Sequence, residues 1–138
     1  MAVVEELIRS QSDGTLSFGN YKLAEKAKRS DFVFHEDVYK IKTYFEITRL
    51  EKNELFAYES VPGTAVSDYR QEDDGLFFRV EGAKDAQITV GLEPETEYIV
   101  LINGSSTGSM KTNLGGKLSF GIELENASEM VEVRIRKA

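Results

Sequence analysis

The single histidine of this chain, His35, is the first residue to consider for catalysis, because histidine is the commonest general acid or base in enzymes. Its neighbours Glu36 and Asp37 could orient an imidazole, but adjacent residues of a strand point to opposite faces. We therefore expect a structural or surface role for His35. The chain contains no cysteine, which excludes a thiol nucleophile and leaves a zinc site without its usual ligands.

An acidic run formed by Glu72, Asp73 and Asp74 precedes Gly75 and is the densest group of oxygen ligands in the sequence. Calcium binds several carboxylate and carbonyl oxygens from loops, so this run is the candidate cation site. The three residues are contiguous and lack the alternating spacing of an EF-hand loop. A solvated hairpin tip is the favoured interpretation, because Asp-Gly favours a tight turn between strands, so we expect no metal site here. We expect no cofactor.

Glycoside hydrolysis requires two carboxyl groups that face each other across a cleft. The chain has 24 acidic residues, and no spacing singles out one pair among them. Hydrolysis is therefore the least favoured of the functions that we consider.

Exposed aromatic rings are the usual means by which β-sandwich modules bind sugars, since a sugar face can stack on a ring. This chain has no tryptophan and six tyrosines. Tyr44 lies opposite the apolar positions of its expected strand, and Tyr69 lies near the acidic run. We expect these two rings to be exposed and name them as ligand-binding candidates. The alternative is that the tyrosines fill the interior and edges of a sandwich.

Alternating apolar and polar residues occur in short runs along the whole chain, which is typical of half-buried strands. The clearest runs are 39–45, 76–81 and 131–136, and turn residues such as Pro62-Gly63 and Asn103-Gly104 separate the runs. The pattern predicts an all-β fold, an antiparallel β-sandwich of jelly-roll-like type with about nine to eleven short strands. Residues 24–30 and 105–111 are expected to lie outside the strands, as an exposed polar segment and a turn.

The length of 138 residues suits a single β-sandwich domain spanning 1–138. A two-part sandwich is the alternative, with a C-terminal half at about 92–138, where the short runs recur at near-regular spacing.

The formal net charge of −7 disfavours nucleic acid and anionic lipid as partners, because both require clustered basic residues. The basic residues form two small groups, one in a loop-like segment and one on a predicted strand: Lys22, Lys26, Lys28 and Arg29, and Arg134, Arg136 and Lys137. We expect neither nucleic acid nor a membrane as a partner.

Three features indicate a cytoplasmic protein, unless the chain is a module excised from a longer one. It has no cysteine, its first residues show no basic and apolar regions of a secretory signal, and no apolar run approaches the ~20 residues of a membrane span.

Residues 92–137 resemble the C-terminal β-sandwich modules of bacterial polysaccharide-active proteins. The resemblance rests on L-x-P-x-T-x-Y, on ING and on MKTNLGGKLSF. Over its length the chain also resembles a group of small clostridial proteins that carry an "endosialidase" label, through SDGTLSFGNYKL, YESVPGTAV and KTNLGGKLSF. Sialidases repeat an S-x-D-x-G-x-x-W box, whereas residues 10–18 have a different spacing and no tryptophan. The resemblance implies an accessory module and no catalytic residue.

The sequence therefore favours a non-catalytic interaction or assembly module that self-associates into a homo-oligomer, because many short strands leave sheet edges that must be covered. The alternative is a module that binds a carbohydrate or another small ligand. A sialidase-like glycoside hydrolase ranks third.

Overall fold

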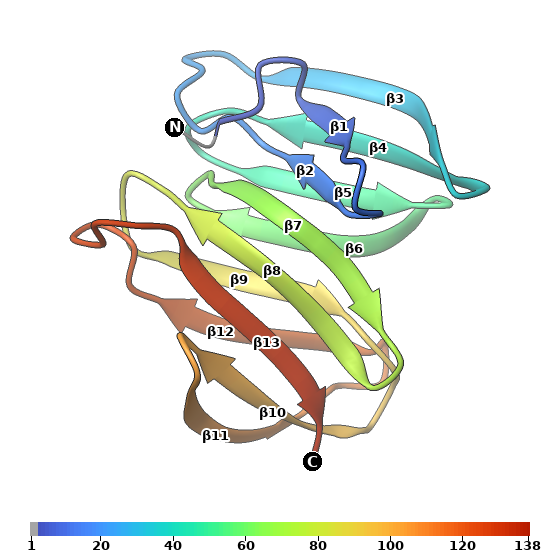
Figure 1. Cartoon of the computed structure of the whole chain (residues 1–138), viewed down its shortest axis with the longest axis vertical. Coiled ribbons are helices and arrows are strands. Elements are labelled where there is room, and N and C mark those ends of the chain that lie inside the picture. The colour runs from blue at the N-terminus through green and yellow to red at the C-terminus, as the bar shows by residue number, and fades with distance from the viewer. Residues whose placement is uncertain (1–2) are drawn as a thin grey trace.

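A computed structural model describes residues 3–138, and within this range the chain forms thirteen strands and no helix. The strands make two antiparallel sheets of seven and six strands. Figure 1 shows the sheets as two layers, with β7, β8 and β13 in front of β6, β9 and β12. The prediction of an all-β antiparallel sandwich is confirmed.

The seven-stranded sheet, sheet A, has the order β1-β2-β7-β8-β13-β10-β11. Its strands are β1 (Ile8–Ser10), β2 (Leu16–Phe18), β7 (Ala65–Glu72), β8 (Gly75–Glu81), β10 (Glu97–Ile102), β11 (Ser105–Lys111) and β13 (Val131–Lys137). The six-stranded sheet, sheet B, has the order β12-β9-β6-β5-β4-β3. Its strands are β3 (Ala27–Phe34), β4 (Asp37–Thr43), β5 (Thr48–Lys52), β6 (Leu55–Val61), β9 (Ala86–Gly91) and β12 (Lys117–Ile122).

Thirteen strands exceed the predicted nine to eleven, and two polar segments that were expected to lie outside the strands belong to strands. Residues 27–30 form the first half of β3, and residues 105–111 form β11. Most side chains of both segments are exposed, so neither segment shows an alternation of apolar residues. Pairing with β4 and with β10 supplies the backbone hydrogen bonds that hold these segments extended.

Aromatic rings from both sheets meet in the core. Phe18 makes edge-to-face contacts with Tyr58 and Tyr69, with ring centres 5.2 and 5.3 Å apart. Tyr58 contacts Phe78 in the same manner at 5.6 Å. Since Tyr58 belongs to sheet B and the other three to sheet A, this cluster joins the two layers.

A chain of buried hydroxyl groups lies beside these rings. Thr64 is its centre: its Oγ1 lies 2.8 Å from the Tyr58 hydroxyl and 2.7 Å from Ser60 Oγ, and its amide donates to Thr48 Oγ1. Thr48 Oγ1 in turn lies 2.8 Å from Thr43 Oγ1. Burial raises the pKa of Tyr58, so its hydroxyl stays protonated and is able to donate.

Replacing Thr64 by valine is expected to lower the free energy of unfolding by about 2 kcal/mol, because Tyr58 and Ser60 would each lose a buried partner. Valine keeps the shape of threonine, so the loss would report the hydroxyl and not a cavity. Urea denaturation would measure it. Ser109→Ala, which removes a hydroxyl at an exposed position of β11, is the control, with an expected change within ~0.5 kcal/mol. Equal effects of the two substitutions would contradict this role for the network.

Candidate functional site

The structure contradicts the expected exposure of Tyr69. Its side chain is only 6% exposed and belongs to the core cluster, where it contacts Phe18. A bulge explains the difference: the register of β7 against β8 shifts between Ser67 and Arg70, and Asp68 has a φ of 56°. The extra residue reverses the alternation and turns Tyr69 inward. Tyr69 is therefore not available to stack on a sugar.

Tyr44 is half-buried and lies directly after β4. Its hydroxyl donates to Glu46 Oε1 at 2.6 Å, and this hydrogen bond raises the pKa of Tyr44. The ammonium group of Lys26 lies 5.9 Å from its ring centre, and Phe45 contacts the ring edge-on. Tyr44 thus remains a candidate for ligand contact, beside a cation.

The acidic run is a hairpin tip. Asp73 and Asp74 form the turn between β7 and β8 and are exposed. The Glu72 carboxylate instead accepts hydrogen bonds from two arginines. Glu72 Oε1 accepts a hydrogen bond from Arg134 at 2.6 Å, and Oε2 accepts one from Arg70 at 3.3 Å. Within residues 3–138, no group of three or more potential ligands is arranged to hold a metal ion. The structure thus favours the hairpin tip over a calcium site at this loop, because two arginines already bind the Glu72 carboxylate.

The outer face of sheet A carries a layer of three arginines over one ring. Phe77 points away from the core, yet it is only 3% exposed, because Arg70, Arg79 and Arg134 cover it. Their guanidinium carbons lie 4.2, 5.1 and 4.7 Å from the ring centre. Cation–π attraction and the burial of an aromatic ring explain why these side chains lie flat on the sheet.

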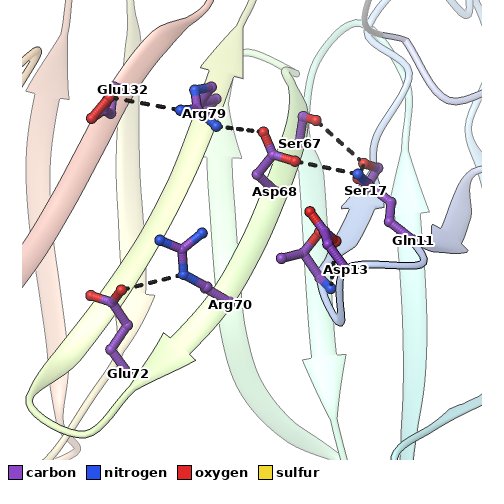
Figure 2. A network of polar contacts seen from close by, with 10 residues as sticks. Gln11, Asp13, Ser17, Ser67, Asp68, Arg70, Glu72, Arg79 and Glu132 are labelled. Carbon is purple, nitrogen blue, oxygen red and sulfur yellow. Dashed lines mark hydrogen bonds and ion pairs between the residues drawn. The ribbon is translucent and has the colours of Figure 1, made fainter.

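Carboxylates compensate each of these arginines, as Figure 2 shows for Arg70 and Arg79. Arg79 forms ion pairs with Asp68 at 2.6 Å and with Glu132 at 3.9 Å. The Glu72 carboxylate forms ion pairs with both Arg70 and Arg134. Asp68 also accepts a hydrogen bond from Gln11, which accepts one from Ser17. With every arginine paired, we interpret this face as a structural cover for Phe77.

The outer face of sheet B differs, because three of its lysines, Lys28, Lys40 and Lys42, make no ion pair within residues 3–138. In the strand register, Lys28 of β3 lies opposite Lys42 of β4, and Lys42 lies opposite Arg49 of β5. The same row continues through Glu59, Thr89 and Ser119, so it crosses all six strands. We call these six residues the polar row. Neighbouring strands are about 4.8 Å apart, so the row spans roughly 24 Å and its cationic part roughly 10 Å.

The cationic part of the polar row surrounds a hollow of about 200 Å³, lined by Lys28, Lys40, Lys42, Arg49 and Glu51. In the part of the chain that the structure describes, the three lysines make no ion pair, and the exposed Lys28 and Lys40 are open to solvent. The pKa of Lys42 is lowered by its partial burial and by the neighbouring charges of Lys26, Arg49 and Lys28.

Among the described residues that line the hollow, Arg49 is the cation that makes an ion pair. Its Nε lies 3.5 Å from Glu59 Oε2, which is an ion-pair distance, but this buried Nε makes no hydrogen bond. The guanidinium carbon also lies 5.8 Å from the ring centre of Phe56. The arrangement holds Arg49 in place and leaves its hydrogen-bonding capacity partly unused.

Comparison with protein-family models, with curated proteins and with solved structures finds no match to this chain. Among residues 3–138, no helix is long and apolar enough to cross a membrane. The remaining candidate from the sequence, His35, is exposed in the turn between β3 and β4, where its ring contacts Phe34.

The sequence analysis missed the cationic part of the polar row. It assigned Lys28 to a loop-like group and did not connect it with Lys42 and Arg49. A signal was present, because Lys40 and Lys42 alternate with the apolar Tyr39 and Ile41 and so had to share the outer face. The missing information was the pairing partner on each side of β4.

Proposed function

We propose that this chain is a non-catalytic interaction module that binds an anionic oligosaccharide on the outer face of sheet B. The observation that carries the proposal is the direct alignment of three cations, Lys28, Lys42 and Arg49, on adjacent strands of a chain with a net charge of −7.

Like charges directly opposite each other destabilise a sheet, by about 0.5 kcal/mol per pair. The chain has 24 acidic residues and uses carboxylates to neutralise all three arginines over Phe77. In the described part of the chain, no carboxylate forms an ion pair with Lys28 or with Lys42. The hollow holds four cations and one carboxylate, Glu51, and an anionic ligand would supply further negative charge. Ammonium and guanidinium groups bind oxyanions by charge-assisted hydrogen bonds.

The composition of the whole polar row supports a carbohydrate. After the three cations come Glu59 and the hydroxyl groups of Thr89 and Ser119, whose oxygens lie 2.7 Å apart. An acidic oligosaccharide presents carboxylate or sulfate groups together with many hydroxyls, which suits a surface of cations, acceptors and hydroxyls. Tyr44 and its neighbour Lys26 lie near this surface and offer a ring beside a cation.

Other anionic partners fit the row less well. A folded protein would require a desolvated apolar centre, whereas the polar row has none. A nucleic acid would bring continuous phosphates against Glu59 and against the field of a chain of net charge −7. Binding is proposed and not hydrolysis, because the hollow gathers cations, whereas a glycosidase requires two facing carboxyl groups.

Titration calorimetry with three tetrasaccharides tests the proposal: a carboxylated oligogalacturonate, a sulfated heparin fragment and the neutral cellotetraose. We expect the acidic ligands to bind and the neutral one not to bind. Lys42→Gln is expected to weaken binding about tenfold at low salt, since a hydrogen bond to a charged group contributes roughly 1.5 kcal/mol. The carboxylated and sulfated arms distinguish which oxyanion the hollow prefers.

Lys84→Gln, an exposed lysine in the loop before β9, is the matched control and should leave the affinity unchanged. Equal binding of the neutral sugar, no binding of either acidic sugar, or an unchanged affinity in Lys42→Gln would each overturn the proposal. Tighter binding of a short duplex DNA than of both acidic sugars would assign the row to a different ligand.

A further inference from the structure

The usual polarity of a sheet is reversed where β4 ends, β5 begins and β6 ends. Three residues there are polar and fully buried, and they belong to the hydroxyl chain around Thr64: Thr43, Thr48 and Ser60. Because successive residues of an extended chain alternate between faces, their apolar neighbours belong to the outer face. These neighbours are Tyr44, Ile47 and Val61, and we call them the apolar row.

The members of the apolar row lie side by side. The Tyr44 amide donates to the Ile47 carbonyl at 3.0 Å, which continues the pairing of β4 with β5. In the pairing of β5 with β6, Thr48 lies opposite Ser60, so Ile47 lies beside Val61. Val61 is 52% exposed, and Tyr44 and Ile47 are half-buried. The apolar row is therefore accessible from solvent.

The apolar row runs parallel to the polar row. Its three residues are each two positions away from a member of the polar row in the same part of the chain, which are Lys42, Arg49 and Glu59. Two residues of a strand span roughly 6.8 Å, so the cations and the apolar side chains are neighbours on one face. A ligand that is charged at one edge and apolar on its face matches this pair of rows.

The ring of Tyr44 is held in place. Its hydroxyl donates to Glu46 at 2.6 Å, and Phe45 contacts it edge-on with ring centres 5.5 Å apart. The Lys26 ammonium lies 5.9 Å from the ring centre, close to the outer limit of cation–π attraction. A ring that is already fixed loses little conformational freedom when a ligand stacks on it.

The opposite side of the polar row offers a different surface. Lys40 lies opposite Glu51 there in the strand register. The next ring, Phe56, is already contacted by cations, because the Lys117 ammonium lies 4.4 Å and the Arg49 guanidinium carbon 5.8 Å from its centre. Charged groups thus occupy that side, and the apolar side chains lie on the side of Tyr44.

We propose that the apolar row is a second subsite, which holds the face of a sugar ring in the same oligosaccharide whose acidic group occupies the cationic hollow. A sugar ring has polar edges and apolar C–H faces, and such a face stacks on an aromatic ring. The inference rests on the proposed binding of an acidic oligosaccharide. It adds that the ligand is recognised by its rings as well as by its charge, with Tyr44 and Val61 as the contact residues.

A tryptophan at position 44 tests this subsite directly, because the chain contains no other tryptophan. In Tyr44→Trp, titration with the oligogalacturonate tetrasaccharide is expected to shift the indole emission to shorter wavelength, since a sugar face would displace water from the ring. The dissociation constant from the emission should equal the one from calorimetry.

Val61→Ser provides the second measurement and should weaken binding of the same tetrasaccharide about fivefold, because an apolar contact is lost. The loss should be equal at low and high salt, whereas the effect of Lys42→Gln should shrink as salt is added. Val33→Ser is the matched control, since Val33 is an exposed valine of β3 outside both rows, and it should leave the affinity unchanged. Circular dichroism would show that every variant is folded.

The outcomes separate this inference from the proposed function. A tetrasaccharide that binds in calorimetry without changing the indole emission would overturn the subsite and leave the cationic hollow as the binding site. A Val61→Ser variant that binds as tightly as Val33→Ser would do the same. An equal response of the indole to cellotetraose would overturn it as well and would assign the apolar row to neutral sugars. If neither acidic sugar binds the wild type, the proposed function fails and the subsite fails with it.

Discussion

Replacing Gly75 by alanine is expected to lower the free energy of unfolding by about 4 kcal/mol, close to a thousandfold in the ratio of folded to unfolded chain. Gly75 begins β8 and pairs with Arg136 of β13. A Cβ atom there would lie 1.7 Å from the carbonyl oxygen of Ile135 and 2.6 Å from its carbonyl carbon. Both atoms belong to the backbone of a central strand, so relief requires β8 and β13 to separate.

Chemical denaturation of Gly75→Ala would measure this loss, and Gly121→Ala provides the matched control. Gly121 also lies in a strand, but the nearest atom to a Cβ there is Gln87 Oε1 at 3.7 Å. Alanine should change stability there by about 0.5 kcal/mol or raise it, because it restricts the unfolded chain. Similar values for the two variants would show that close approach of the backbones is not what requires glycine at position 75.

The sequence predicted those strands whose two faces differ in polarity. In β4, Tyr39 and Ile41 are buried while Lys40 is exposed, and β13 shows the same alternation in Val131, Val133 and Ile135. The period of two was therefore visible without a structure. β11 lacked this signal, because its side chains are nearly all exposed and only its hairpin with β10 makes it a strand.

Two features of the candidate sites were not visible in the sequence for a different reason, which is the effect of neighbouring strands. A single bulge residue, Asp68, reversed the expected orientation of Tyr69. The hydrogen bond between Glu72 and Arg134 could not be predicted, because the two residues are far apart in the sequence. They come close only because β8 pairs with β13. Local patterns define a strand, but the chemistry of a sheet surface depends on which strands pair.

The polar row follows the same rule. Its six residues are far apart in the sequence, and they form one row only because six strands pair in this order and register.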